Sequence, residues 1–257
     1  MNRYLDLVDP WTRPSRAEVD DLWDIACLQR QVPFRLEKSG DLNAPSSSTV
    51  VVAASILSCQ VVQVLVEKGN ESFLWATIFR EDMEVFKLYL SKIEGVGFVL
   101  LGFLVDFSES YDLHSIGCLL VDSFLIGRWI VLDSMPGYKM GIVPEENNIT
   151  RYCLSSQSKQ DSSLHPLLSY ILEAPAALTG LSAALMTRLE IGKQYGCAIV
   201  VSENQLDNSE PSVFALLVAL QLLIPFDCSV EYIENVILPQ VENKHRRYKA
   251  KRDSLYL

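Results

Sequence analysis

The sequence has no hydrophobic run long enough to cross a lipid bilayer. Its longest strongly apolar stretch, residues 213–224, is interrupted by Gln221 and falls short of the roughly 20 residues that a transmembrane helix needs. The first residues also lack the charged and then apolar pattern of a secretory signal, because Asp6 and Asp9 interrupt them. We therefore expect a protein without a membrane segment, located in the cytoplasm and able to occur in the nucleus as well.

Residues that bind metals and cofactors are scarce. The chain of 257 residues has only three histidines, and its six cysteines are far apart, with no Cys-x-x-Cys pair and no histidine at ligand spacing. We expect these cysteines to act as small core residues in a reducing compartment. The glycines Gly95, Gly97 and Gly102 open an apolar run instead of following one, which indicates a turn and not a dinucleotide-binding loop. We expect no metal and no cofactor.

A catalytic residue set is missing as well. Residues 180–184 lack the final glycine of the G-x-S-x-G nucleophile motif and follow no strand, so small-residue helix packing is favoured over a nucleophilic Ser182. His114, His165 and His245 lie in a helix-like stretch, a polar loop and a basic tail. Nothing in their spacing assembles them with a nucleophile and an acid. The sequence therefore favours a protein that is not an enzyme.

The N-terminal part of the chain predicts one helix and then a group of strands. A capping-box pattern at Ser15 and Glu18 predicts a helix that ends near Arg30. Three runs of β-branched or aromatic residues follow and predict an initial antiparallel set, with a hairpin turn between the last two: 49–57, 61–66 and 72–79, with the turn at 68–70.

From residue 81 onward the pattern changes to an alternation of helices and buried strands. The predicted helices are 81–93, 111–126, 176–189, 211–224 and 229–249, and the predicted strands are 96–105, 128–133 and 197–202. Residues 137–165 are polar and predict a loop or an insertion. The alternation implies a partly parallel sheet with helices on its faces. No linker or internal repeat divides the chain, so we expect a single α/β domain over residues 1–243 and a tail over 244–257.

The tail has the opposite charge to the rest of the chain. Residues 244–252 contain six lysines and arginines and no acid, whereas the remainder has 16 basic and 32 acidic residues. Such a run is either a solvated helix end or mobile arm, or a tether that carries the end of the chain to an acidic surface. A nucleic-acid arm is less favoured, because phosphates would repel the acidic body, and we expect no nucleic-acid partner.

The chain ends in a hydrophobic residue, a tyrosine and one further residue: Leu255, Tyr256 and Leu257. An aliphatic side chain, an aromatic ring with a polar tip and a terminal carboxylate suit capture in a narrow pocket lined by a cation or by backbone donors. By chance, roughly 2% of chains of this composition would end in the same way. The ending alone therefore does not decide the function.

Two further segments strengthen the signal from the C-terminal third. Residues 173–205, EAPAALTGLSAALMTRLEIGKQYGCAIVVSENQ, have a proline shortly before an apolar-Thr-Gly helix start and a long loop into a buried strand. Residues 211–226, PSVFALLVALQLLIPF, form the next apolar helix. With the hydrophobic-tyrosine-any terminus, this order resembles the family of heterodimeric proteasome assembly chaperones, and within it the first subunit in its fungal form.

The resemblance implies a three-layer α/β/α sandwich with a mixed sheet, similar to nucleoside phosphorylases but without their activity. It implies pairing with a second, related subunit, and binding of this heterodimer to the outer face of the proteasome α-ring. Leu255, Tyr256 and Leu257 would enter a pocket between α subunits, where a lysine meets the terminal carboxylate. The alternatives are an enzyme of the nucleoside phosphorylase or hydrolase type on the same scaffold, and a scaffold unrelated to the proteasome whose ending is accidental.

Overall fold

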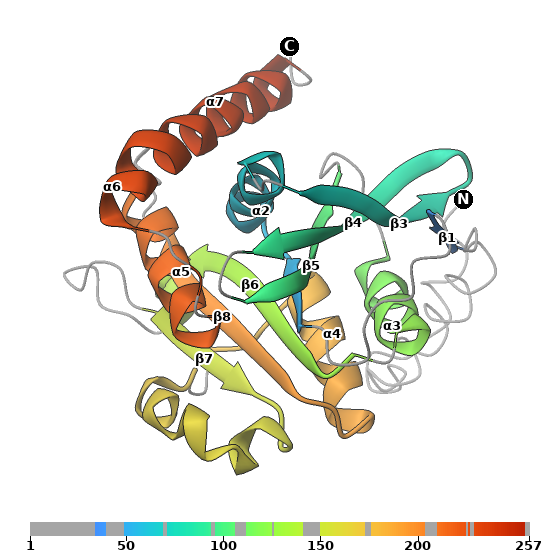
Figure 1. The fold of residues 1–257 in the computed structure, drawn as a ribbon, viewed down its shortest axis with the longest axis vertical. Coiled ribbons are helices and arrows are strands. Elements are labelled where there is room, and N and C mark those ends of the chain that lie inside the picture. Colours follow the sequence, from blue (N-terminus) through green and yellow to red (C-terminus); the bar gives the residue numbers. More distant parts are fainter. Residues whose placement is uncertain are drawn as a thin grey trace, which may run out of the picture. The chain divides into compact units, whose positions relative to one another are not determined.

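One mixed sheet of eight strands lies at the centre of the fold (Figure 1). The structure is a computed structural model, and it describes residues 34–39, 49–68, 71–93, 96–105, 112–124, 126–140, 150–172, 176–203, 210–224, 226 and 229–254. In the last helix, side chains are described as far as Arg247. All of these residues belong to one compact unit, Phe34–Leu257.

The strands of the sheet are β1 (Phe34–Lys38), β2 (Thr49–Ala53), β3 (Ser72–Arg80), β4 (Met83–Ile93), β5 (Gly97–Leu104), β6 (Arg128–Pro136), β7 (Thr150–Leu154) and β8 (Gly196–Glu203). The α-helices are α2 (Ile56–Lys68), α3 (Leu113–Ser123), α4 (Gly180–Ile191), α5 (Glu210–Leu223), α6 (Val230–Tyr232) and α7 (Leu238–Ser254). A π-helical turn, η4 (Ile233–Ile237), joins α6 to α7. Short 3-10 helices are η1 (Gly137–Met140), η2 (Ser158–Gln160) and η3 (Ser162–Tyr170).

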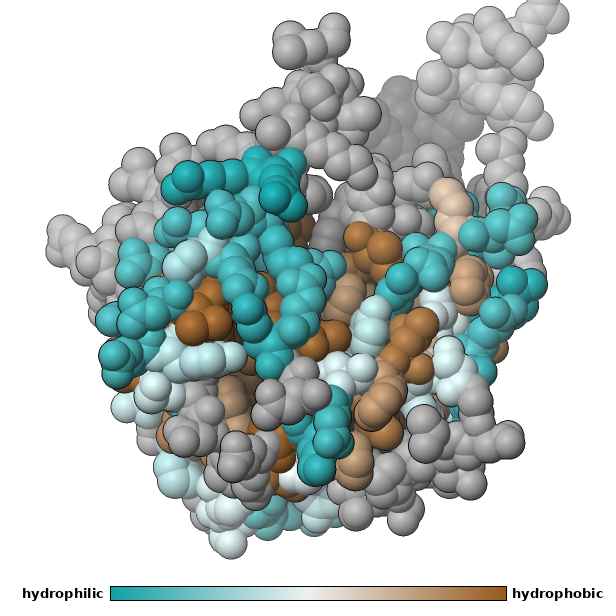
Figure 2. Space-filling view, turned by 45° about the horizontal axis from the view of Figure 1, so that its top comes forward, coloured by the Kyte–Doolittle hydropathy of each residue, from teal (hydrophilic) through white to brown (hydrophobic). Residues whose placement is uncertain are grey.

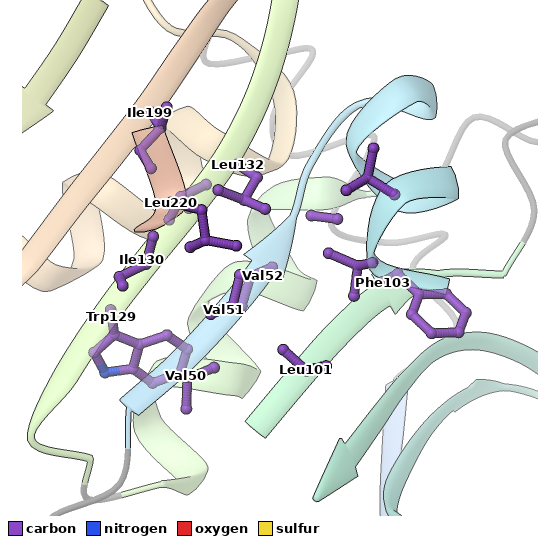
Figure 3. Close-up of a cluster of buried hydrophobic side chains, with 14 of the residues drawn as sticks. Val50, Val51, Val52, Leu101, Phe103, Trp129, Ile130, Leu132, Ile199 and Leu220 are labelled. Atoms are coloured by element: carbon purple, nitrogen blue, oxygen red, sulfur yellow. The ribbon is translucent and has the colours of Figure 1, made fainter. Parts of the chain in front are cut away.

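The strand order is β1-β3-β4-β5-β2-β6-β8-β7. The neighbouring strands β5, β2, β6 and β8 are parallel, whereas β1, β3 and β4 on one side and β7 on the other pair antiparallel. The central residues of the parallel strands are apolar and buried, as is typical of strands that helices cover on both faces. Val50, Val51 and Val52 of β2 are completely buried (Figure 3).

Helices cover both faces of this sheet. Helices α3 and α4 pack against each other on one face, while α2, α5 and the first turns of α7 pack together on the other (Figure 1). Gly117 permits the close approach of α3 to α4, because a Cβ at this position would lie 2.9 Å from the Cβ of Ala184. The core between the layers includes Leu101, Trp129 and Ile130 from the strands and Leu220 from α5 (Figure 3).

The predicted fold class is confirmed: this is an α/β fold with a mixed, partly parallel sheet and helices on its faces. Strands β5, β6 and β8 and helices α3, α4 and α5 agree with the prediction to within a few residues. The predicted N-terminal helix from Ser15 lies outside the described residues. None of the described helices combines the length and hydrophobicity that a membrane crossing requires.

Three local predictions were wrong. Residues 61–66 belong to helix α2, and residues 83–93 form strand β4 instead of a helix. Consequently β2 does not pair with β3 in an initial antiparallel set, and the antiparallel neighbours are β1, β3, β4 and β5. The polar segment 137–165 contains the edge strand β7, which pairs with β8, and three short 3-10 helices, so it is not a simple loop.

Candidate functional site

The sequence placed the functional residues at the end of the chain, beyond helix α7. Leu255, Tyr256 and Leu257 lie outside the described residues, so their predicted role is not tested by the structure. The basic run before them belongs to α7, which continues to Ser254. Figure 1 shows the last turns of α7 (red) away from the other elements. The backbone of the basic run is therefore helical, as the interpretation of the run as a helix end expects.

The first half of α7 is attached to the domain. Val241 is completely buried, and Leu238 one turn earlier is also buried. The Lys244 Nζ lies 2.7 Å from Glu67 Oε1 of α2, and His245 Nδ1 lies 3.3 Å from Gln60 Oε1 of the same helix. These contacts fix the direction in which the helix leaves the domain.

The weak catalytic candidate Ser182 lies in the first turn of α4 and is completely buried. Its hydroxyl donates a hydrogen bond to Asp133 Oδ2 of β6 and lies 2.9 Å from the backbone oxygen of Thr179. The backbone N–H of Ser134 donates to Asp133 Oδ1 at 2.8 Å. Sequence reasoning missed Asp133, which is hidden in an apolar strand with no motif around it.

The polar contacts continue from Asp133 along the carboxyl edge of the parallel strands. The Ser134 hydroxyl is hydrogen-bonded to the Glu203 carboxylate at the end of β8. Ser55, just after β2, places its Oγ 2.7 Å from the same Ser134 hydroxyl. We call Ser55, Asp133, Ser134, Ser182 and Glu203 the serine–carboxylate cluster. Its members come from the edge at which parallel α/β sheets commonly bind ligands.

Burial, and to a smaller extent the nearby Glu203 charge, raise the pKa of Asp133 to about 6, against the lowering effect of the hydrogen bonds from Ser182 and Ser134. A buried, perturbed carboxyl next to a serine hydroxyl is a feature of many active sites. A nucleophilic serine, however, needs a base that takes its proton and a path for substrate. Among the described residues no histidine bonds to Ser182 or Asp133. Neither residue lines the cavity between α5 and β7 or the cavity between α2 and α7.

The other titratable groups do not form a catalytic or metal centre in the part of the chain that the structure covers. His114 Nε2 lies 3.6 Å from Cys118 Sγ, one turn further along α3, and the exposed side of α3 also carries Asp122, which pairs with Arg188. No group of three or more possible metal ligands occurs among the described residues. Cys59 and Cys197 are buried, in agreement with their expected role in the core.

Hydrophobic side chains also reach the surface of the domain. Figure 2 shows hydrophobic side chains (brown) exposed between hydrophilic ones (teal) on the face that it views. The most exposed large aliphatic residues are Leu222 of α5, at 68%, and Ile191 of α4, at 66%. Single exposed residues of this kind are ordinary, so only a contiguous group indicates a binding surface.

Leu222 belongs to such a group. A groove of about 610 Å³ lies between α5, the edge strand β7 and the π-helical turn with the start of α7. Its lining is mainly apolar and includes Tyr152, Phe214, Val218, Leu222 and Leu238, with Glu234 from the π-helical turn. We call it the α5 groove. A π-helical turn in the wall of a groove is a common feature of functional sites.

Comparison with known proteins gives a result for structure but not for sequence. No family model matches the chain, and no curated protein matches it significantly. A solved structure of Pyrococcus furiosus PbaA, an archaeal homologue of proteasome-assembly chaperone, matches with a TM-score of 0.61 and 11% identity over 87% of this chain and 96% of the other. The described domain shares the fold of that protein.

Two further structures place the fold in the same group. Pyrococcus furiosus PbaB, an archaeal proteasome activator, matches with a TM-score of 0.60 and 9% identity over 88% of this chain and 98% of the other. A proteasome-assembly chaperone homologue from Mycobacterium tuberculosis matches with a TM-score of 0.51 and 9% identity, over 80% and 94% of the two chains. At these identities the likeness concerns the fold, and it does not single out the fungal first subunit.

Proposed function

We propose that this protein is a chaperone for assembly of the proteasome core particle, and that it acts without catalysing a reaction. The observation that carries the proposal is the fold shared with an archaeal homologue of proteasome-assembly chaperone over 87% of this chain. This likeness is independent of the sequence motifs, because only 11% of the aligned residues are identical.

The tail supplies the proposed contact with the proteasome. Val241 of helix α7 is completely buried, and Lys244 pairs with Glu67 of α2. The helix carries the basic run to within three residues of the chain's end. In the proposed complex, the basic helix approaches acidic surface of the α-ring, and Leu255, Tyr256 and the Leu257 carboxylate enter a pocket between two α subunits. A charge-assisted hydrogen bond of that carboxylate is worth about 1.5 to 3 kcal/mol, so the tail adds to a larger interface and does not replace it.

The α5 groove is the proposed pairing surface for a second, related subunit. Its apolar lining, with the largely exposed Leu222, would be removed from water by a partner. Stable protein interfaces bury roughly 1,200 to 2,000 Å² in total, so the groove would form the centre of a wider contact. We also propose that the protein is not an enzyme. This part of the proposal is supported by the burial of Ser182, which has no histidine partner among the described residues.

Binding of the purified chain to α-rings tests the role of the tail. We expect Tyr256→Ala to weaken binding by a factor of about 5 to 150, corresponding to roughly 1 to 3 kcal/mol, without a change in melting temperature. One residue added after Leu257 should have nearly the same effect, because it displaces the carboxylate and keeps every side chain. Tyr138→Ala, which changes an exposed tyrosine of η1, is the matched control and should bind like the wild type. Equal binding by all four proteins would exclude tail docking.

Coexpression with candidate related subunits tests the pairing surface. We expect Leu222→Asp to abolish the heterodimer in size-exclusion chromatography, because it places a charge in the apolar groove. Ile191→Asp is the matched control, since Ile191 is equally exposed but lies on α4. Loss of pairing by Ile191→Asp alone would move the interface to the α3–α4 layer and contradict the assignment to the α5 groove.

A further inference from the structure

A second, smaller cavity lies between α2 and α7, with a volume of about 210 Å³. Its lining residues come from three elements. Cys59, Gln60 and Gln63 belong to α2, Val105 follows directly after β5, and Lys244 and Arg247 belong to α7. We call it the α2–α7 cavity. It is separate from the α5 groove, with which it shares no lining residue, and from the serine–carboxylate cluster.

The cavity occupies a favoured position for ligands in α/β folds. It opens where β2 leads into α2 and where β5 ends, and these two strands are parallel neighbours. The chain leaves β2 toward one face of the sheet, to α2, and leaves β5 toward the other face, to α3 (Figure 1). Adjacent strands whose connections diverge in this way leave a crevice at their carboxyl ends, and ligands bind in such crevices.

The charge of the lining is positive. Arg247 forms no ion pair with any described residue, and Lys244 reaches the cavity beside its salt bridge with Glu67. No carboxylate is among the lining residues. Burial raises the pKa of the Cys59 thiol, so Cys59 stays uncharged at neutral pH and adds no negative charge. The lining thus contains two cations and no acid, and Lys244 shares its charge with Glu67 outside the lining.

A buried amide adds hydrogen-bonding capacity. Gln60 is only 6% exposed, and its Oε1 is occupied by His245 Nδ1 at 3.3 Å. Within the described residues its Nε2 donates no hydrogen bond. Gln60 lines the cavity, so this nitrogen is available to an acceptor bound there. A guanidinium, an ammonium and an amide N–H are all donors, and together they select an oxyanion.

The size of the cavity limits the ligand. A volume of 210 Å³ corresponds to about seven waters at roughly 30 Å³ each, and it lies below the roughly 300 to 1,000 Å³ of pockets that enclose drug-sized molecules. We propose that the α2–α7 cavity binds a phosphate group, either free inorganic phosphate or the phosphate of a small monoester, through Arg247, Lys244 and Gln60. The phosphate bridges α2 and α7 and thereby fastens the C-terminal helix to the domain.

Calorimetric titration of the purified chain with inorganic phosphate tests this site, in buffers of constant ionic strength adjusted with chloride. We expect saturable binding of one phosphate per chain and a rise in melting temperature, because the ligand binds the folded state only. Arg247→Gln should weaken binding at least about tenfold, corresponding to the loss of one charge-assisted contact. Arg246→Gln is the matched control, because Arg246 neighbours Arg247 on the same helix but pairs with Glu242 outside the cavity.

A parallel titration with glycerol phosphate separates the two sources of the ligand. Tighter binding of the ester assigns the site to a phosphate monoester, and tighter binding of the free ion assigns it to inorganic phosphate. The proposal is overturned if phosphate stabilises the chain no more than chloride does. It is also overturned if Arg246→Gln and Arg247→Gln weaken binding equally, since diffuse attraction to a basic helix would then explain the effect. Neither result depends on binding to α-rings.

Discussion

Two polar regions lie at the carboxyl edge of the same parallel strands, and they differ in access. The serine–carboxylate cluster around Asp133 has hydrogen bonds to Ser182 and the Ser134 N–H and lines no described cavity. The α2–α7 cavity has an open volume, two cations and the amide of Gln60 in its lining. The first region resembles an active site by residue type, but its serines and carboxylates bond to one another, whereas the second encloses a volume of about 210 Å³.

The difference shows how a perturbed carboxyl can be structural. In the serine–carboxylate cluster, the hydroxyl of Ser182 is used to solvate Asp133 inside the core, so it compensates part of the cost of burying a carboxylate. In the α2–α7 cavity, by contrast, Arg247 and the Gln60 amide nitrogen are left without partners among the described residues. A cation without an ion-pair partner next to open volume is the stronger indication of anion binding.

The largest expected effect concerns Asp133 and pH. Its pKa of about 6 in the folded chain lies above its usual value of 3.8, so the folded state binds the extra proton and stability falls as pH rises through this interval. Between about pH 4 and about pH 7.5 we expect Asp133 to lower the free energy of unfolding by roughly 2 to 3 kcal/mol. Urea denaturation across this range should show a smaller change in the free energy of unfolding for Asp133→Asn than for the wild type. The two changes should differ by roughly 2 to 3 kcal/mol.

The same comparison has an outcome that would contradict it. If the pH profiles of Asp133→Asn and the wild type run parallel, Asp133 is ionised in the folded chain with a normal pKa. The serine–carboxylate cluster would then have to be hydrated, and its contrast with the α2–α7 cavity would disappear.

A somewhat smaller effect is expected from Ser182→Ala. The substitution removes a donor from a buried carboxylate and should cost about 2 kcal/mol of stability at neutral pH. It should raise the pKa of Asp133 further and leave α-ring binding of the folded protein unchanged. Ser163→Ala, at an exposed serine, is the control for loss of a hydroxyl. A folded Ser182→Ala protein that had lost a measurable turnover would instead support the enzyme alternative.

The smallest effect should come from Glu67→Gln, at the rim of the α2–α7 cavity. Glu67 and Lys244 form a partly exposed pair at the surface, and surface pairs contribute about 0 to 1 kcal/mol. We therefore expect stability within roughly 0.5 kcal/mol of the wild type. Phosphate binding should become a few-fold tighter, because Lys244 is released from its acid. Weaker phosphate binding by this variant would show that the salt bridge positions Lys244 and does not compete with the ligand.

The sequence predicted the parallel half of the sheet better than the antiparallel half. The runs that became β5, β6 and β8 have apolar central segments flanked by polar or turn residues, so pattern and length agree. Residues 61–66 misled because valines favour strands, yet α2 is a buried helix in which tertiary packing outweighs propensity. In β4 the buried Phe86, Leu88 and Leu90 alternate, but the surrounding charges imitate an amphipathic helix.

The candidate sites were predictable to different degrees. The basic run and the terminal tyrosine are consecutive in sequence, and they could be found by reading along the chain. Asp133 and Ser182 are 49 residues apart and meet only because β6 and α4 are adjacent layers. The α2–α7 cavity joins residues even further apart, such as Gln60 and Lys244. No local pattern encodes such pairs, since the fold alone brings them together.

The π-helical turn Ile233–Ile237 determines how helix α7, which follows it, is rotated about its own axis. Residues 233, 237 and 241 are buried at steps of four, which the wider π-helical turn brings closer to one line than the 3.6-residue period of an α-helix would. Each residue of an α-helix advances the azimuth by about 100°. Deleting one residue from this turn would therefore keep α7 helical but rotate Lys244 and Arg247 away from α2. The extra residue of the π-helical turn thus determines which side of the basic helix faces α2.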